Sequence, residues 1–190
     1  MLQPKLIVIS APSGCGKTTI VREIFKRHPD MKFSVSATTR KQRSGEVYGK
    51  DYFFLSKDEF EQRIKNNELV EWEKIYDNYY GTLKGEVDRA LESGTTMIFD
   101  IDVKGALNIK KKYPKDAVLI FIEPPSVEIL QQRLTGRKTE SDEVIRKRLE
   151  RVPMELERGK EFDFRVVNDK LEKAISDVDT IINNAIKANA

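Results

Sequence analysis

The sequence predicts an α/β fold with three layers, in which helices cover both faces of a doubly wound parallel sheet. Three observations favour this fold. Apolar strand-like runs alternate with helical segments along the chain, and a glycine-rich loop joins the first run to the first helix. The run at residues 117–122 is apolar without alternation, which is typical of a strand buried on both faces. With 190 residues, the chain is long enough for one such domain with small inserted lobes.

The loop at residues 11–18 has the composition of a phosphate-binding loop. Its sequence is Ala-Pro-Ser-Gly-Cys-Gly-Lys-Thr, and it stands between a predicted strand at 6–10 and a predicted helix at 19–28. Backbone N–H groups of such a loop and the N-terminus of the following helix form an anion site. Lys17 can then reach the β- and γ-phosphates of a nucleotide, and the Thr18 hydroxyl can bind magnesium. The usual pattern begins with glycine, for which this chain has the small residue alanine.

The loop and the first helical turn supply the candidate contacts for a nucleoside triphosphate. These candidates are Ser13, Gly14, Cys15, Gly16, Lys17, Thr18 and Thr19. Cys15 is the only cysteine of the sequence, so no internal disulfide can form and a reducing cytoplasm is expected. We interpret Cys15 as a small filler, whose neighbours act through their backbone, rather than as a redox group.

The composition argues against two classes of partner. The sequence has 34 Lys and Arg residues against 31 acidic residues, and a formal charge of +3 is too mild to indicate nucleic-acid binding. No apolar stretch approaches the ~20 residues that span a bilayer, and the N-terminus runs directly into the first strand without room for a signal peptide. We therefore expect a cytoplasmic protein that binds small anionic molecules, as a monomer or a small homo-oligomer.

Residues 34–93 are predicted to form an insertion into the α/β core. The predicted strands lie at residues 32–37, 52–55 and 69–76. Ser56 and Glu59 have the spacing of a capping box, so a helix is expected to follow Ser56. Residues 79–82 are expected to lead into a second helix that ends before Gly94. In the strand at 69–76, alternation places Val70 and Trp72 opposite Glu71 and Glu73.

The core is predicted to resume at residue 95. The strand at residues 95–100 ends in Asp100, and Asp102 follows it. A carboxylate at the end of a strand next to a phosphate-binding loop suits magnesium, so Asp100 and Thr18 are the candidate metal ligands. The remaining elements are predicted as a helix to about residue 113, the strand at 117–122, a helix capped by Ser126, a charged helix at 142–158, a strand at 164–167 and a helix at 171–188.

Several short motifs, in order along nearly the whole chain, resemble those of guanylate kinases. They are Ser36-Ala-Thr-Thr-Arg40, Arg43-Ser-Gly-Glu46, Gly49-Lys-Asp-Tyr-Phe53, Glu71-Trp72, Tyr79-Tyr-Gly-Thr82, Asp100-Ile-Asp102, Arg133-Leu134, Arg137-Lys-Thr-Glu140 and Val167-Asn-Asp169. The resemblance implies transfer of the γ-phosphoryl group of ATP to GMP with Mg²⁺. It also implies a P-loop NTPase core at residues 1–33, 94–125 and 159–190, a GMP-binding lobe at 34–93 and a lid at 126–158.

The same resemblance implies two groups of residues around GMP. The GMP phosphate would be held by Arg40, Arg43, Tyr52 and Tyr80, since guanidiniums give bidentate charged bonds and phenols add neutral donors. The guanine edge would be read by Ser36, Glu71 and Thr82, with Asp102 nearby. A carboxylate accepts both N–H donors of guanine, whereas adenine would leave it unpaired. Without the resemblance, a solvated loop for the arginines and an outward-facing Glu71 are equally good interpretations.

For the reacting phosphate, the resemblance implies Lys17, Arg137 and Arg148 as catalytic cations, and Arg133 and Asn168 as further contacts of ATP. Phosphoryl transfer depends mainly on positioning and charge neutralisation, which these cations supply. The chain departs from the family pattern at two positions: Lys104 stands where glutamine is more common, and Lys138 stands where glycine is usual.

Two other functions remain compatible with these motifs. One is a nucleoside monophosphate kinase with another base preference. The other is a non-catalytic guanylate-kinase-like binding module, although such modules usually lose part of the phosphate-binding loop, and Gly14, Gly16, Lys17 and Thr18 are intact here.

Overall fold

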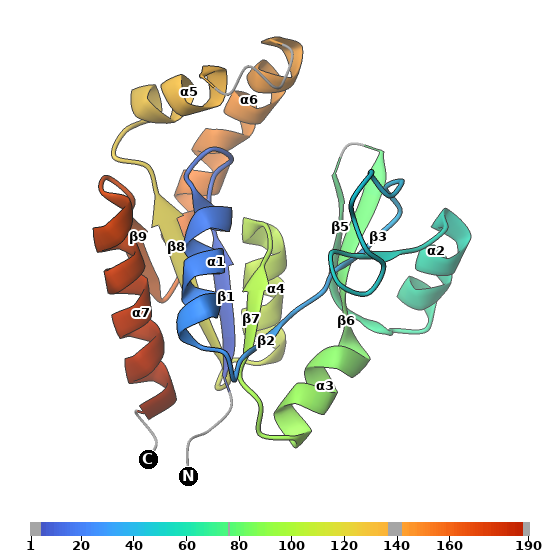
Figure 1. Cartoon of the computed structure of the whole chain (residues 1–190). Coiled ribbons are helices and arrows are strands. Elements are labelled where there is room, and N and C mark those ends of the chain that lie inside the picture. The colour runs from blue at the N-terminus through green and yellow to red at the C-terminus, as the bar shows by residue number, and fades with distance from the viewer. Residues whose placement is uncertain (1–4, 76, 137–141, 188–190) are drawn as a thin grey trace.

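The structure is a computed structural model that describes residues 5–75, 77–136 and 142–187. Over these residues the strands form two sheets (Figure 1). The core sheet has five strands in the order β2-β7-β1-β8-β9, and the second sheet has four in the order β4-β3-β6-β5. Every pairing in the core sheet is parallel. The predicted α/β class and parallel core sheet are confirmed.

The strands of the core sheet lie close to their predicted positions. Their bounds are β1 Leu6–Ser10, β2 Lys32–Phe33, β7 Met97–Asp100, β8 Ala117–Glu123 and β9 Phe164–Val167. The apolar residues of β1 are fully buried because both faces of this central strand are covered. Ile7 and Ile9 face one apolar cluster, whereas Leu6 and Val8 face the other. Burial on both faces explains why the strand lacks polar alternation.

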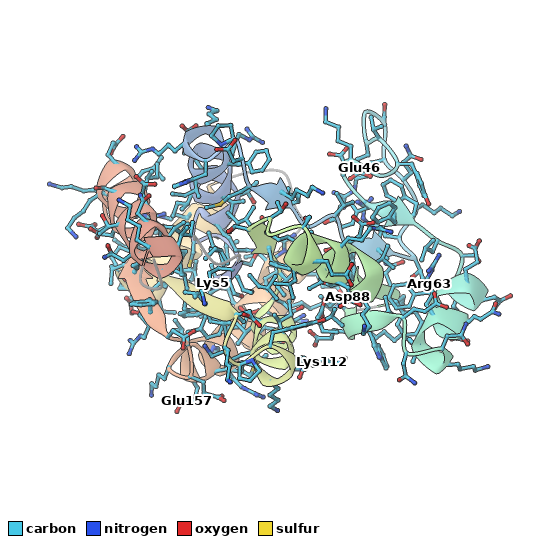
Figure 2. The ribbon with its side chains drawn as sticks, turned by 90° about the horizontal axis from the view of Figure 1, so that it is seen from below. Lys5, Glu46, Arg63, Asp88, Lys112 and Glu157 are labelled. Atoms are coloured by element: carbon cyan, nitrogen blue, oxygen red, sulfur yellow. The ribbon has the colours of Figure 1, made fainter. Side chains whose placement is uncertain are left out.

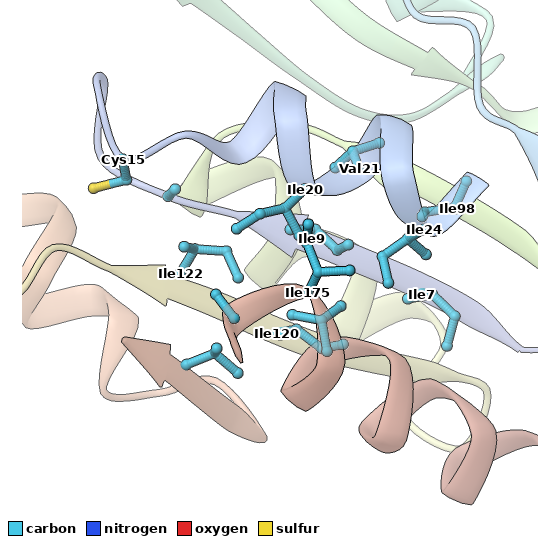
Figure 3. Packing of buried hydrophobic residues seen from close by; sticks show 14 of the residues in the cluster. Ile7, Ile9, Cys15, Ile20, Val21, Ile24, Ile98, Ile120, Ile122 and Ile175 are labelled. Carbon is cyan, nitrogen blue, oxygen red and sulfur yellow. The ribbon is translucent and has the colours of Figure 1, made fainter. Parts of the chain in front are cut away.

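Helices pack on both faces of the core sheet. On one face, α1 (Lys17–Arg27) and α7 (Leu171–Lys187) contribute Ile20, Ile24 and Ile175 to the cluster around Ile7 and Ile9 (Figure 3). The other face is covered by α4 (Val103–Lys112). Each fully buried aliphatic side chain contributes roughly 1.5–3 kcal/mol, so these clusters hold the loop after β1 on a rigid base.

The inserted lobe stands beside the core. Its elements are β3 Ala37–Thr38, β4 Phe53–Phe54, α2 Lys57–Lys65, β5 Leu69–Ile75, β6 Asn78–Leu83 and α3 Lys84–Glu92. The capping box of Ser56 and Glu59 is present at the start of α2. Figure 2, seen from below, shows the core with Lys5 and Glu157 on one side and the lobe with Glu46 and Arg63 on the other.

One prediction about the lobe was wrong. The strand predicted at residues 32–37 is two strands in different sheets, since β2 pairs with β7 of the core and β3 pairs with β4 and β6. Residues 79–82 lead into α3, which ends before Gly94 as expected, and they do so as part of β6, which pairs with β5 in antiparallel register. The tyrosines and threonine of this segment favour a strand, and pairing with β5 gives them that conformation.

The segment predicted as a lid contains two helices. They are α5 (Val127–Thr135), capped by the Ser126 hydroxyl as expected, and α6 (Asp142–Gly159). Figure 1 shows both above the loop that joins β1 to α1. Helix α7 ends at Lys187, close to its predicted end.

Candidate active site

A cavity of about 360 Å³ lies between the core and the lobe. Its core side is built from the loop after β1, the end of β7 and helix α6, and its lobe side from β5 and β6. The residues that line it are Ala11, Ser13, Lys17, Ser36, Tyr52, Glu71, Ile75, Tyr80, Gly81, Asp100, Ile101, Asp102, Arg148, Arg151 and Glu155. Ligands of parallel α/β sheets bind at the carboxyl ends of strands, and β1 and β7 end at this cavity.

The phosphate-binding loop is held in shape by its neighbours. Gly14 and Gly16 have φ angles of 91° and 82°, which favour glycine. A side chain at Gly16 would lie 2.7 Å from Nδ2 of Asn168, and that nitrogen donates to the Cys15 carbonyl at 2.7 Å. Both terminal nitrogens of Arg133 donate to the Asn168 carbonyl at 3.1 Å. Thus Asn168 contacts the loop directly, and Arg133 is bonded to Asn168.

Cys15 is fully buried and belongs to the apolar cluster around Ile7 and Ile9. Burial raises the pKa of its thiol to about 12, so the reactive thiolate is scarce at neutral pH. The interpretation of Cys15 as a small filler agrees with this environment.

Lys17 and Asp100 face each other across the gap between the loop and the end of β7. Their side chains form an ion pair. Burial lowers the pKa of Lys17 to about 8, although the nearby Asp102 and Glu155 carboxylates oppose this shift. A buried ammonium gains from further negative charge, so the polyphosphate of a nucleotide suits this position.

Arg148 connects α6 to the phosphate-binding loop. Its Nη1 donates to the Ser13 hydroxyl at 2.8 Å, and both residues line the cavity beside Lys17. The candidate Arg137 lies outside the described residues, as does Lys138.

On the lobe side, Arg40 packs with two tyrosines. Its guanidinium lies 5.3 Å from the centre of the Tyr52 ring, and the rings of Tyr52 and Tyr80 are 6.2 Å apart. Arg40 forms an ion pair of 2.7 Å with Glu46, and the other oxygen of Glu46 accepts from the backbone N–H of Arg43 at 2.8 Å. Glu46 is not among the predicted site residues. Its carboxylate pairs with the Arg40 guanidinium, which was predicted to hold the GMP phosphate.

The two arginines lie less close to the cavity than the tyrosines do. Tyr52 and Tyr80 line it, whereas the Arg40 guanidinium packs over the Tyr52 ring and the Arg43 side chain is exposed. Tyr52 also borders a second hollow with Lys17, Thr18 and Asp100. The tyrosines therefore connect the arginine loop with the phosphate-binding loop.

Glu71 points into the cavity from β5. A shift of register between Leu69 and Glu71 interrupts the pairing of β5 with β6, and such bulges redirect side chains. Glu71 is 6% exposed, whereas its neighbour Trp72 is 44% exposed. The outward-facing Glu71 that the alternation left open is therefore excluded.

The surroundings of Glu71 are tight and partly apolar. Thr82 donates its hydroxyl to Oε1 at 2.6 Å, and a side chain at Gly105 would lie 2.7 Å from Oε2. Burial raises the pKa of Glu71 to about 7, while the bond from Thr82 opposes the shift. Such a carboxylate gains from N–H donors that would compensate its burial.

Asp102 begins α4 and also borders the cavity. Its Oδ1 accepts from the backbone N–H groups of Lys104 at 2.8 Å and Gly105 at 3.1 Å, which caps the helix. Ser36 lines the same cavity at the passage from the core to the lobe. The candidates Ser36, Glu71 and Asp102 therefore line the same cavity, and Thr82 is bonded to Glu71.

Two residues of α6 in the cavity were missed as site residues. Arg151 and Glu155 lie one and two turns after Arg148, so they share its face of the helix. Glu155 is 8% exposed, and burial raises its pKa to about 7. This helical spacing from Arg148 was the available signal, but a charged helix usually presents such residues to water.

Two other features of the described residues concern membrane-spanning helices and clusters of metal-binding side chains. The helices described here include none with the length and apolar character needed to cross a bilayer. Within the same residues, groups of three or more His, Cys, Asp or Glu side chains suited to holding a metal ion are absent.

The sequence matches a family model and several known proteins of the same family. Residues 3–185 match the family model described as Guanylate kinase. A guanylate kinase of Chlorobium luteolum is 47% identical over 180 residues, which cover 95% of this chain and 91% of that protein. One from Salinibacter ruber is 47% identical over 184 residues, covering 96% and 97%.

A solved structure agrees with the sequence matches. The crystal structure of guanylate kinase from Anaplasma phagocytophilum superposes with a TM-score of 0.80 at 26% identity, covering 98% of this chain and 88% of that one. The family match spans almost the whole chain, and the cavity contains the predicted groups from both the loop and the lobe. The chain therefore belongs to the guanylate kinase family.

Proposed function

We propose that this chain transfers the γ-phosphoryl group of ATP to GMP, giving ADP and GDP, in purine nucleotide metabolism in the cytoplasm. The observation that carries the proposal is the composition of the cavity. Lys17, Asp100 and Arg148 border it on the core side, and Glu71, Tyr52 and Tyr80 border it on the lobe side. A donor phosphate and an acceptor nucleotide can therefore meet in one space.

ATP would bind along the phosphate-binding loop. The backbone N–H groups of residues 13–19 would hold the phosphates, with Lys17 beside the β- and γ-groups. Arg133 and Asn168 lie next to the loop and would contact the nucleoside. Arg148 reaches Ser13 and is placed to neutralise charge on the transferring group, with Arg137 as its proposed partner.

GMP would bind in the lobe. Its phosphate would displace Glu46 from Arg40 and accept further bonds from Arg43, Tyr52 and Tyr80. Its base would donate N1–H and N2–H to Glu71 and accept at O6 from a hydroxyl or backbone donor. Thr82, Ser36 and Asp102 would hold Glu71 and the base in place.

Magnesium fits the donor set between the loop and β7. The Thr18 hydroxyl and the Asp100 carboxylate border one hollow, and hard oxygen ligands of this kind suit Mg²⁺ with phosphates as its other ligands. When bound, the ion would neutralise charge on the β- and γ-phosphates. Asp100 would then exchange its contact with Lys17 for the metal, which leaves Lys17 to the phosphates.

The test is an assay of ADP production with AMP, GMP, UMP, CMP and dTMP as acceptors. Turnover should be highest with GMP. Lys17→Met should lower kcat by orders of magnitude with the fold intact, whereas Lys26→Met, in an exposed position of the same helix, should not. Preference for another base would refute the guanine assignment, and no turnover with any acceptor would favour a binding module.

A further inference from the structure

Glu73 of β5 connects the lobe to two cations of the core. Its Oε1 lies 2.9 Å from Nζ of Lys104 in α4 and 4.0 Å from Nη2 of Arg151 in α6. The Glu73 side chain is only 15% exposed. None of these three residues has a role in the proposed reaction.

The contact runs beside the proposed guanine site. Glu73 follows Glu71 by two residues on β5, so both side chains lie on the same face of the strand. Lys104 follows Asp102 by two residues at the start of α4. The Glu73–Lys104 pair is therefore adjacent to the two carboxylates that border the cavity, and it joins the elements that carry them.

Charge neutralisation explains why this pair matters. Within the described part of the chain, Oε2 of Glu73 is buried without a hydrogen-bond donor, and the Asp102 carboxyl faces Glu73. Two close carboxylates repel each other. Lys104, which also lies at the cap formed by Asp102, offsets this repulsion and allows β5 to approach α4.

Two other hydrogen bonds between lobe and core lie away from the cavity. Nζ of Lys112 donates to the Leu69 carbonyl at 3.3 Å, and the Tyr113 hydroxyl donates to Asp88 at 3.3 Å. Both involve the end of α4 opposite to Lys104. The Glu73 pair is thus placed to control the spacing at the cavity end of the α4–β5 contact.

We propose that Lys104 and Glu73, assisted by Arg151, are positioning residues that hold β5 against the start of α4, so that Glu71 and Asp102 face the guanine base together. This inference rests on the proposed function. Preorganisation of this kind lowers the ordering cost of binding, so it acts on GMP affinity and leaves the chemical step alone. It also gives a role to Lys104, which departs from the family pattern.

The first experiment compares Lys104→Gln, Glu73→Gln and the double variant in steady-state kinetics. Each single variant should raise KM for GMP about three- to tenfold, with kcat and KM for ATP within about twofold of wild type. The double variant should be no worse than the worse single variant, since both remove the same contact, and Lys104→Arg should restore KM. Unchanged KM values, or additive effects in the double variant, would overturn the inference.

The matched control is Lys110→Gln. Lys110 lies in the same helix and pairs with Asp163 at the same distance of 2.9 Å, but this pair lies within the core. Its substitution should leave KM for GMP unchanged. An equal rise in KM for Lys110→Gln would show a general effect of charge in α4 and would overturn the inference.

A second readout is independent of turnover. Spin labels at Lys57→Cys in α2 and Lys173→Cys in α7 report the distance between lobe and core, because both positions are exposed and Cys15 is buried. Without ligands, Lys104→Gln should lengthen or broaden this distance relative to wild type and Lys110→Gln. An unchanged distribution would overturn the inference. A wild-type chain without activity on GMP would refute the proposed function, while the spin-label comparison would still decide whether this pair holds the lobe.

Discussion

Glu71 shows how a single carboxylate can provide discrimination between bases. It is buried beside Gly105 and accepts hydrogen bonds from Thr82, and burial raises its pKa to about 7. The bound guanine would add the donors that offset this burial. A base with an acceptor facing Glu71 would instead leave the charge unpaired, which costs more than the bond itself is worth.

The corresponding prediction concerns Glu71→Gln, which keeps the shape and removes the charge. We expect kcat/KM for GMP to fall by about 10- to 150-fold, which corresponds to about 1.5–3 kcal/mol for a charged hydrogen bond. The KM for ATP should not change. Steady-state kinetics at pH 8 will measure both, with Glu68→Gln, whose side chain is 43% exposed in the same lobe, as the control. An unchanged kcat/KM for GMP would remove Glu71 from base recognition.

A second prediction at the residue scale concerns the pH dependence of stability. Burial raises the folded-state pKa of Glu155 to about 7 from the ordinary value of 4.5, so the folded chain holds a proton that the unfolded chain releases. Stability from this group is therefore complete below pH 4.5 and is lost as the pH rises to about 7.

Glu155→Gln removes this titration. We expect the variant to lose less stability than wild type between pH 5 and pH 8, by on the order of 1–3 kcal/mol. Chemical denaturation at several pH values will measure it. Glu150→Gln, at an exposed position of the same helix, should follow wild type. If Glu155→Gln shows the same slope as wild type, Glu155 is ionised throughout this range.

Most of the site residues that could be predicted stand in recognisable sequence motifs. The residues that were missed acquire their partners and their burial only from the tertiary structure. Lys17, Asp100, Glu71 and Tyr52 could be named because they stand in short recognisable stretches, and all four border the cavity. Glu46 ends one of these stretches and Glu155 lies in a charged helix, but the local sequence gives neither of them a partner. Only the turn that returns Glu46 to Arg40, and the packing of α6 over the cavity, give them partners and burial.

At the scale of elements, the core was easier to predict than the lobe. Strands such as β1 and β8 are buried on both faces, so their composition alone identifies them. In the lobe, β2 and β3 share one alternating run but pair in different sheets, and β6 depends on its pairing with β5. Pairing between distant segments is information that local periodicity does not contain.

The packing of α6 on β8 gives a prediction at this scale. A side chain at Gly159 would lie 2.3 Å from Cε1 of Phe121, whose ring is fully buried in β8. Gly159→Ala should therefore destabilise the fold by about 1–3 kcal/mol through overpacking. Gly85 in α3 has open space around it, so Gly85→Ala should be neutral or stabilise by about 0.4–1 kcal/mol. Urea denaturation of both variants measures the difference, and equal stabilities would contradict the close packing.

At the scale of the whole molecule, the cavity contains ionisable side chains whose pKa values are shifted by burial. Glu71 and Glu155 have pKa values raised by burial, and Lys17 has its pKa lowered by burial. Each shift reports a cost that the unliganded fold carries. Substrates that provide N–H donors on one side and phosphates on the other relieve these costs, so ligand binding should stabilise the whole chain.

The last prediction tests this link with thermal unfolding in the absence of magnesium, where turnover is prevented. GMP at 100 times its Kd should add about 2.7 kcal/mol, which corresponds to a rise in Tm of about 5–11 °C for a chain of this size. ATP alone should also raise Tm, because the phosphate-binding loop belongs to the core. AMP at the same concentration should raise Tm less than GMP does, because it would bind only weakly, as an analogue of ATP. Glu71→Gln should reduce the shift with GMP and leave the shift with ATP unchanged, since Glu71 faces only the lobe side of the cavity. Equal shifts with GMP and AMP in wild type would show that the lobe does not select guanine.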